Sequence, residues 1–172
     1  MLEERMPNVT LQFSMQKQGQ TQWCWAAVAV STAAFYSGRT PHTQCAVVNA
    51  VLHATTCCAA GDSPQCDVPD SLKDALMHVG HLQQTVNGAA TWAAIDRELQ
   101  ANQPVGVLIR LIGGGGHFLA ISGNGTPANQ AITVEDPYQG KSVTKWKLLQ
   151  KSVHGQWFET YFTQPLKSHR SS

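Results

Sequence analysis

The chain has 172 residues, a formal net charge of +1 at neutral pH and a charged fraction of only 13%. This near-neutral balance offers no basic surface for nucleic acid and no polybasic anchor for a membrane, and no apolar run approaches the length that spans a bilayer. The length is enough for one domain with a hydrophobic core of its own. We therefore expect a single domain with no nucleic-acid partner and no membrane span.

Residues 1–17 are expected to form an extended lead-in, because Val9, Leu11 and Phe13 alternate with polar residues as in a short strand. This segment lacks the apolar core of a secretory signal. Three explanations stay open: the protein remains inside the cell, it is exported by another route, or an export signal has been removed.

The functional prediction starts from the segment at about 24–36, which is small or apolar throughout. The next glycine is Gly38, so the pattern predicts a buried helix that ends there, with Thr21 as its cap. Cys24 would lie in the first turn, where free backbone N–H groups and the positive end of the helix dipole favour a thiolate. A buried, unreactive cysteine is the alternative interpretation.

The other four cysteines crowd into one short segment: Cys45, Cys57, Cys58 and Cys66. Adjacent Cys57 and Cys58 do not favour a bond to each other, so two disulfides would each join one of this pair to Cys45 or Cys66. Such bonds suit an oxidising compartment. Zinc, held together with His53 or His42, and plain reduced thiols are the alternatives, although no zinc-type spacing is present. We expect disulfides, with no metal and no cofactor.

Further helices are predicted after Pro41, from a capping box at 71–74 to Gly80, and at 91–102. From Pro104 onward the pattern becomes strand-like. Strands are predicted at 105–112, 117–122, 130–136, 141–147 and 156–163, with a short helix near 148–151.

Helices come first and strands second, an order that favours an α+β fold with two facing halves over alternating βαβ units. We expect a helical half at about 18–103 that carries Cys24, packed against an antiparallel sheet half at about 104–166. Residues 167–172 would form a tail, and 1–172 would be one domain.

His117 begins a predicted strand directly after a run of four glycines, 113–116. Such a run lets a substrate backbone approach closely, or simply forms a flexible hairpin. Asp136 ends the next strand on the face of Ile132 and Val134, where a carboxylate is costly unless it is paired. His117, at the head of the neighbouring strand, is its expected partner. An ordinary edge histidine and an Asp-Pro turn are the alternatives.

A glutamine before Cys24 and a backbone N–H at the helix start would together bind the oxyanion of a tetrahedral intermediate. Four glutamines lie close by, so composition does not choose among them: Gln16, Gln18, Gln20 and Gln22.

These features resemble the papain-like cysteine proteases, and in particular the bacterial AvrRpt2-type family. The resemblance covers about residues 16–163. It rests on QxxxxxCWAA starting at Gln18, on GGHF around His117 and on EDPY around Asp136, where plant papains have Asn in place of Asp.

The resemblance implies a papain-like fold in which Cys24 is the nucleophile and His117 the general base and acid. It further implies that Asp136 orients the imidazole, which we expect to turn Nε2 toward the sulfur, and that Gln18 belongs to the oxyanion hole.

The implied activity is hydrolysis of peptide bonds through a thioester acyl-enzyme, with a protein or peptide as substrate. Secretion as a bacterial effector or toxin is also implied, with an inhibitor or immunity protein as a further partner. An acyltransferase or deamidase that uses the same thioester is one alternative, and a papain-fold binding module without catalysis is another. The oligomeric state is not predicted.

Overall fold

The structure is a computed structural model that describes residues 8–167. In chain order the elements are β1 (Val9–Thr10), α1 (Cys24–Ser37), α2 (Gln44–Leu52), α3 (Leu72–Val79), β2 (Leu82–Asn87), α4 (Trp92–Gln100), β3 (Val105–Leu111), β4 (Gly116–Asn124), β5 (Ala131–Asp136), β6 (Gly140–Lys145), α5 (Trp146–Gln150) and β7 (Gly155–Thr163). Of the predicted tail, only Lys167 lies within the described residues, and residues 1–7 of the lead-in lie outside them.

α1 is the buried helix that the apolar segment predicts, since every residue from Cys24 to Ala33 is buried. Gly38 ends it with φ 71°, a left-handed conformation that glycine adopts at little cost. Thr21 is not its cap: Trp23 occupies that position, and its side chain makes no capping bond. In the part of the chain that the structure describes, no helix combines the length and apolarity needed to cross a membrane.

The next three helices each start at a hydroxyl that accepts a backbone N–H, which is the chemistry of a good N-cap. Thr43 caps α2, Ser71 caps α3 and Thr91 caps α4. The predicted start of α3 is therefore confirmed, as is its end at Gly80, which has φ 85°.

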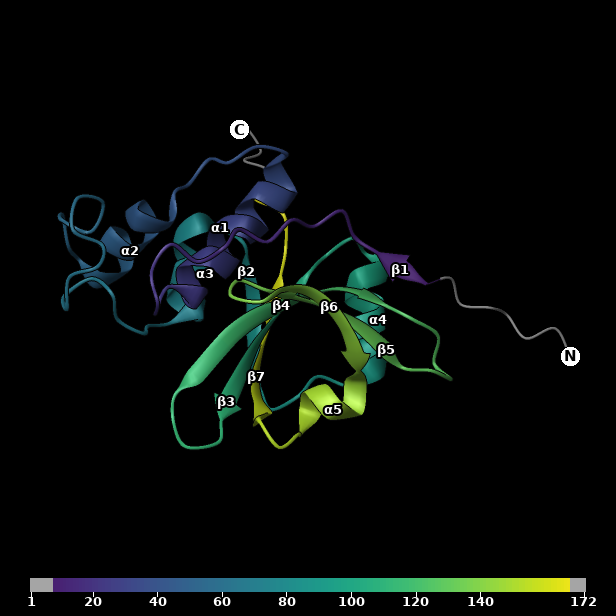
Figure 1. Cartoon of the computed structure of the whole chain (residues 1–172). Coiled ribbons are helices and arrows are strands. Elements are labelled where there is room, and N and C mark those ends of the chain that lie inside the picture. Colours follow the sequence, from purple (N-terminus) through teal and green to yellow (C-terminus); the bar gives the residue numbers. More distant parts are fainter. Residues whose placement is uncertain (1–7, 168–172) are drawn as a thin grey trace, which may run out of the picture.

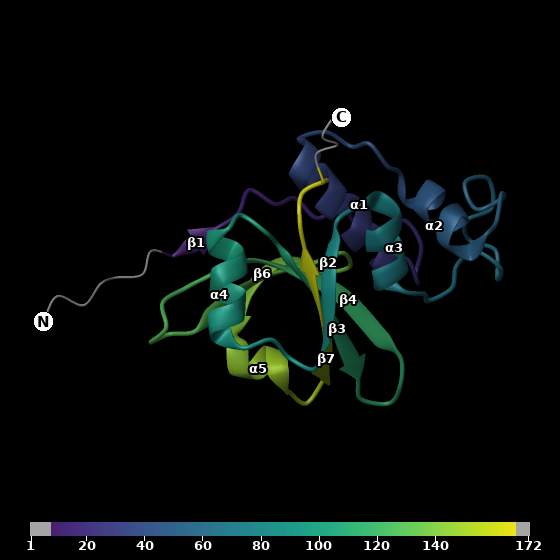
Figure 2. The same ribbon diagram turned by 180° about the vertical axis from the view of Figure 1, so that it is seen from behind.

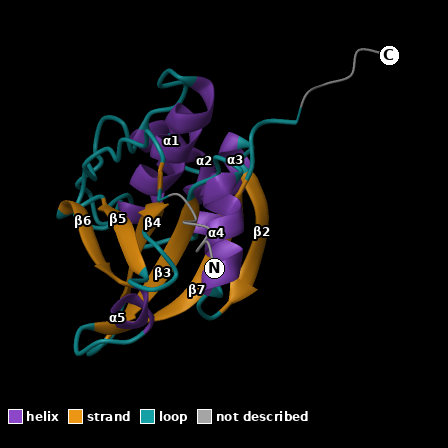
Figure 3. Cartoon of the chain, turned by 90° about the vertical axis from the view of Figure 1, so that its right-hand side faces the viewer, coloured by secondary structure: helices purple, strands orange, loops and turns teal. Residues whose placement is uncertain are grey.

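The strands form one antiparallel sheet in the order β2-β7-β3-β4-β5-β6, with β1 paired to β4. Figure 3 shows them as a curved layer. The α+β prediction is confirmed. We did not predict β2, because its sequence LQQTVN is a mostly polar edge strand with no alternation of buried and exposed residues.

Helices α1, α2 and α3 pack against one another at one side of the sheet, as Figures 1 and 2 show from opposite directions. α1 also packs against β4, whereas α4 lies against β1, β3 and β4. Residue 103 therefore does not separate helices from sheet, because α4 and β2 precede it and both belong with the strands. The start of α1, with Cys24, still lies before residue 103, and the start of β4, with His117, lies after it.

Two disulfides join Cys45 to Cys58 and Cys57 to Cys66, which is one of the pairings expected from the sequence. Cys24 is the free cysteine. Among the described residues, no group of three or more His, Cys, Asp or Glu side chains is placed to hold a metal ion.

Candidate active site

Three side chains far apart in the sequence line one cavity of about 370 Å³. Cys24 is the first residue of α1, His117 is the second residue of β4, and Asp136 is the last residue of β5. Gln18, from the turn before α1, lines the same cavity. The structure thus brings together all four residues that the sequence singles out for catalysis.

His117 and Asp136 form a hydrogen-bonded ion pair, with 2.8 Å between His117 Nε2 and Asp136 Oδ1. A carboxylate can only accept, so Nε2 carries the proton that is donated. Our expectation that Nε2 faces the sulfur is therefore wrong: Nε2 is used by Asp136, and Nδ1 is the nitrogen left for Cys24. The pairing of β5 with β4 brings Asp136 near His117, and the contact itself is made at Nε2.

Burial alone would lower the pKa of His117, because it penalises the charged imidazolium. The hydrogen bond with Asp136, the interaction with the Cys24 thiol and the charges of both groups outweigh burial and raise the pKa of His117 to about 9. The ring and the thiol are therefore close enough to influence each other, and the site favours a protonated imidazole at neutral pH.

Asp136 is held by its own turn as well as by the histidine. Its Oδ1 accepts the backbone N–H groups of Tyr138, at 2.7 Å, and of Gln139, at 3.2 Å. Burial would raise the pKa of Asp136, but the bond from His117 and these two backbone bonds lower it below its ordinary value. The Asp-Pro turn and the pairing with His117 are thus both present, and one carboxylate serves both.

The Gln18 amide faces the cavity but is already engaged. Its Nε2 donates to Gln20 O at 3.0 Å and to Thr21 O at 2.8 Å, so both of its N–H groups meet carbonyls of its own turn. Its backbone N–H donates to Pro137 O at 2.9 Å, which ties this turn to the loop that follows Asp136. An oxyanion at Cys24 would compete with these carbonyls for one amide hydrogen.

A second cavity, of about 610 Å³, adjoins the first and shares Cys24 with it. Its walls include Trp25, Leu108 and Phe118 together with glycines 114–116. The glycine run is the hairpin between β3 and β4, and residues 113–115 have φ values between 81° and 107° that favour glycine. The run is therefore a hairpin connection and also a wall of the cleft without side chains.

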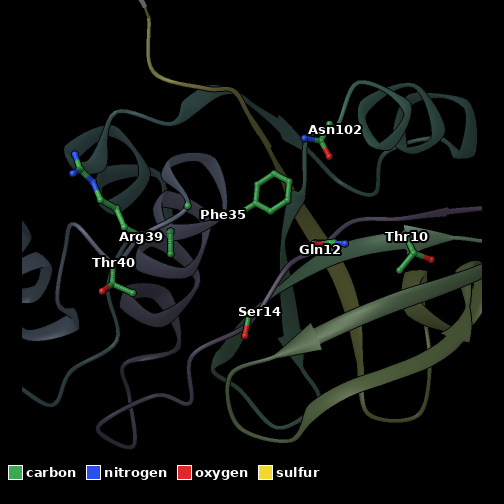
Figure 4. A pocket seen from close by; sticks show the side chains of 9 residues that line it. Thr10, Gln12, Ser14, Phe35, Arg39, Thr40 and Asn102 are labelled. Carbon is green, nitrogen blue, oxygen red and sulfur yellow. The ribbon is translucent and has the colours of Figure 1, made fainter.

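A third cavity, of about 630 Å³, lies between the lead-in and the end of α1 (Figure 4). Its lining includes Thr10, Gln12, Ser14, Phe35, Arg39 and Asn102. None of the four predicted site residues contributes to it, and it offers no nucleophile beside a base. Size therefore does not identify the active site here.

Sequence reasoning missed Asp67. Its carboxylate accepts the Thr21 hydroxyl and the Gln22 backbone N–H, and so contacts the turn that leads into α1. Asp67 stands in an irregular loop, and no local pattern marks it. Asp67 directly follows Cys66, and only knowledge of the Cys57–Cys66 bond would indicate that its position is fixed.

A family model described as "Papain-like cysteine protease AvrRpt2" matches residues 6–152 of the chain. No curated protein sequence gives a significant match.

Two solved structures share the fold at low sequence identity. Xylellain, a cysteine protease from Xylella fastidiosa, superposes with a TM-score of 0.59 at 10% identity, covering 95% of this chain and 87% of xylellain. The peptidase domain of Streptococcus ComA, a bifunctional ABC transporter involved in a quorum-sensing pathway, has a TM-score of 0.54 at 16% identity, with 90% and 99% covered. These similarities support the papain-like fold, and the family match over most of the chain supplies the assignment. The chain belongs to the AvrRpt2 family of papain-like cysteine proteases.

Proposed function

We propose that this protease hydrolyses peptide bonds with Cys24, His117 and Asp136 as its catalytic triad. The observation that carries the proposal is the shared cavity: a free cysteine at a helix start lines it together with an imidazole bonded to a carboxylate. The raised pKa of His117 favours the imidazolium, which is the form that can donate a proton to a leaving group. The attacking group in the proposal is the sulfur of Cys24 as its thiolate.

In the first half-reaction the Cys24 thiolate attacks the scissile carbonyl carbon, and the carbonyl electron pair moves to oxygen. The tetrahedral intermediate collapses as the C–N bond breaks, and the proton on His117 Nδ1 goes to the leaving amine. The product is a thioester. Neutral His117 then takes a proton from water, the hydroxide attacks the thioester, and the Cys24 thiolate leaves as the acid product forms.

The oxyanion would be stabilised by the backbone N–H of Cys24 and by the Gln18 amide. The Cys24 N–H belongs to the first turn of α1, whose donors have no acceptor within the helix. Gln18 would release Gln20 O or Thr21 O as the negative charge develops. Asp136 keeps its hydrogen bond throughout and holds the ring orientation.

The substrate we propose is a protein or peptide that lies across the two cavities sharing Cys24. We also propose that the enzyme works in an oxidising environment outside the cytoplasm, as a secreted bacterial effector or toxin. Two disulfides support the compartment, because such bonds persist where thiols are not kept reduced.

The test is a peptide-library digestion with the full chain, beside Cys24→Ala as control. We expect cleavage by the wild type, none by Cys24→Ala, and covalent attachment of an electrophilic peptide at Cys24 by mass spectrometry. Full turnover by Cys24→Ala would end the proposal. Mass analysis of the products separates the activities, since hydrolysis adds water across a peptide bond, deamidation converts a glutamine to glutamate, and transfer joins the acyl group to an amine.

A further inference from the structure

The loop between α2 and α3, residues 53–71, contains three of the four disulfide-bonded cysteines, and we call it the disulfide loop. One carboxylate from this loop holds the turn that precedes the nucleophile. Asp67 Oδ2 accepts the Thr21 hydroxyl at 2.6 Å, and Asp67 Oδ1 accepts the Gln22 backbone N–H at 2.8 Å. These residues are separated by more than 40 positions in the sequence. Both donors lie just before Trp23, the residue at the cap position of α1, so Asp67 fixes the chain immediately ahead of the helix.

Asp67 is itself fixed by its neighbours. Cys66, just before it, is fully buried and bonded to Cys57, and its carbonyl accepts Trp23 Nε1 at 2.8 Å. Val68, just after it, accepts Trp25 Nε1 through its carbonyl at 3.0 Å. Three consecutive residues of the loop therefore bind the chain on both sides of the nucleophile, Cys24, between Thr21 and Trp25.

The packing between loop and turn leaves little space for adjustment. A Cβ added to Gly61 would lie 2.8 Å from Trp23 Cη2 and 3.1 Å from Gln20 Nε2, closer than ordinary contacts allow. The loop thus packs against the turn at Gly61 and bonds it through Asp67, whose carboxylate makes two hydrogen bonds there.

The turn that Asp67 holds carries the two carbonyls that orient Gln18. Gln18 Nε2 donates to Gln20 O and to Thr21 O, and Thr21 is the residue whose hydroxyl Asp67 accepts. We propose that Asp67 is a positioning residue for catalysis, which acts through the 20–22 turn to hold the Gln18 amide at the place where the oxyanion forms. This inference rests on the proposed function of Cys24 and Gln18.

The first experiment is Asp67→Ala, with kcat and KM measured on a cleaved peptide. We expect kcat to fall about 10- to 100-fold, because a misplaced oxyanion donor weakens transition-state stabilisation, while KM changes little. Asp62→Ala is the matched control, since Asp62 is an exposed aspartate of the same loop. Asp62→Ala is expected to keep wild-type kcat.

Two probes of Cys24 separate positioning from general damage to the fold. Iodoacetamide alkylates the thiolate at a saturated carbon and forms no oxyanion, so its rate is expected to be unchanged in Asp67→Ala. A peptide aldehyde forms a hemithioacetal with an oxyanion, so its affinity is expected to fall together with kcat. Equal losses with both probes would mean that Asp67 supports the fold and nothing more, and would overturn the inference.

A double-mutant cycle with Gln18→Ala tests whether Asp67 acts through Gln18. If it does, Asp67→Ala costs little further kcat once Gln18 is removed. Additive losses would overturn the inference, as would wild-type kcat in Asp67→Ala. If Asp67→Ala does not fold, Thr21→Val removes one of the two bonds and is expected to show the same pattern with a smaller loss, and wild-type kcat there counts against Asp67.

The two proposals fail in different ways. Turnover by Cys24→Ala, or no alkylation of Cys24 in the wild type, would remove the proposed function and this inference with it. Normal turnover by Asp67→Ala, with Cys24 still labelled, would remove only the role of Asp67.

Discussion

At the scale of single residues, His117 is governed by opposing influences. Burial disfavours its charge, while Asp136 and Cys24 favour it, and the second influence is stronger because the pKa rises to about 9. The partner carboxylate shifts the other way, with a lowered pKa. Both groups are therefore charged across neutral pH, which is the state that the proposed mechanism requires.

The first prediction concerns the alkaline limb of activity. His117 must be protonated to donate to the leaving amine, so kcat/KM is expected to fall as pH rises through about 9. Asp136→Asn keeps an oxygen that can accept from His117 but removes the charge that raises the pKa of the ring. The limb is then expected at lower pH, with kcat/KM measured across pH 6 to 10 in both proteins. An alkaline limb at the same pH in Asp136→Asn would show that Asp136 does not set the protonation of His117.

The second prediction concerns the pH dependence of stability. A raised pKa in the folded state means that His117 stabilises the fold fully below its ordinary pKa of 6.5 and loses this contribution as pH rises through about 9. The lowered pKa of Asp136 works in the opposite sense, and its contribution disappears as pH falls through the folded value. The difference in unfolding free energy between wild type and His117→Ala should therefore shrink from pH 6.5 to above pH 9. Urea unfolding at a series of pH values measures it, and a constant difference would contradict the assignment.

At the scale of elements, the disulfide loop holds the segment that leads into α1, through bonds to the Gln22 N–H and to the indoles of Trp23 and Trp25. α2, α3 and α4 start at their own Thr43, Ser71 and Thr91, whereas α1 starts at Trp23 with no side-chain bond. The hydroxyl caps are local and visible in the sequence. The support for α1 comes from residues 66–68, which the Cys57–Cys66 bond holds close to it.

The third prediction follows from this support. Replacing Cys57 and Cys66 together by Ser is expected to lower the free energy of unfolding by about 2–3 kcal/mol and to lower kcat as well, because Asp67 loses its anchor. The matched control replaces Cys45 and Cys58, whose bond joins α2 to the same loop. That pair should lose stability with little change in kcat. Urea unfolding and peptide turnover measure both, and equal loss of kcat in the two variants would contradict the specific role of the Cys57–Cys66 bond.

At the scale of the whole molecule, the last strand in the sequence lies inside the sheet. β7 pairs with β2 on one side and with β3 on the other, although the family match ends at residue 152, before β7 begins. It buries Trp157, Tyr161 and Phe162 almost completely. The sheet is therefore continuous only with β7 in place, because β7 joins β2 to β3. β4, which carries His117, is the neighbour of β3 on its other side.

The fourth prediction is that a chain ending at residue 152 does not reach the folded state. Burial of each large apolar side chain contributes about 1.5–3 kcal/mol, so loss of three removes an amount comparable to the whole stability of a typical domain. We expect a far-UV circular dichroism spectrum of an unfolded chain and no turnover. A chain ending at Lys167 is the control and should behave as the full chain. A cooperative thermal transition in the 152-residue chain would contradict the essential role of β7.

The sequence alone predicts most elements, because helix caps, glycine stops and periodic burial are written in neighbouring residues. It also identifies Cys24, His117 and Asp136 as candidate catalytic residues, because each is a reactive side chain at one end of a predicted helix or strand. β2 was missed, because an exposed edge strand shows no period. Alternation along β5 puts Glu135 on the face opposite Ile132 and Val134, yet Glu135 is buried as well, and its carboxylate accepts the Ser122 hydroxyl and pairs with Lys141 Nζ.

Only the tertiary structure decides which nitrogen of His117 meets Asp136, which cysteines pair, and which residue holds the turn before Cys24. Each of these depends on distances between segments that are remote in the chain, and local patterns carry no information about such distances. Spacing along the sequence placed a thiol, an imidazole and a carboxylate at the ends of their elements. Strand register and the packing of α1 on β4 brought them into one cavity, because the core forms only where those surfaces fit together.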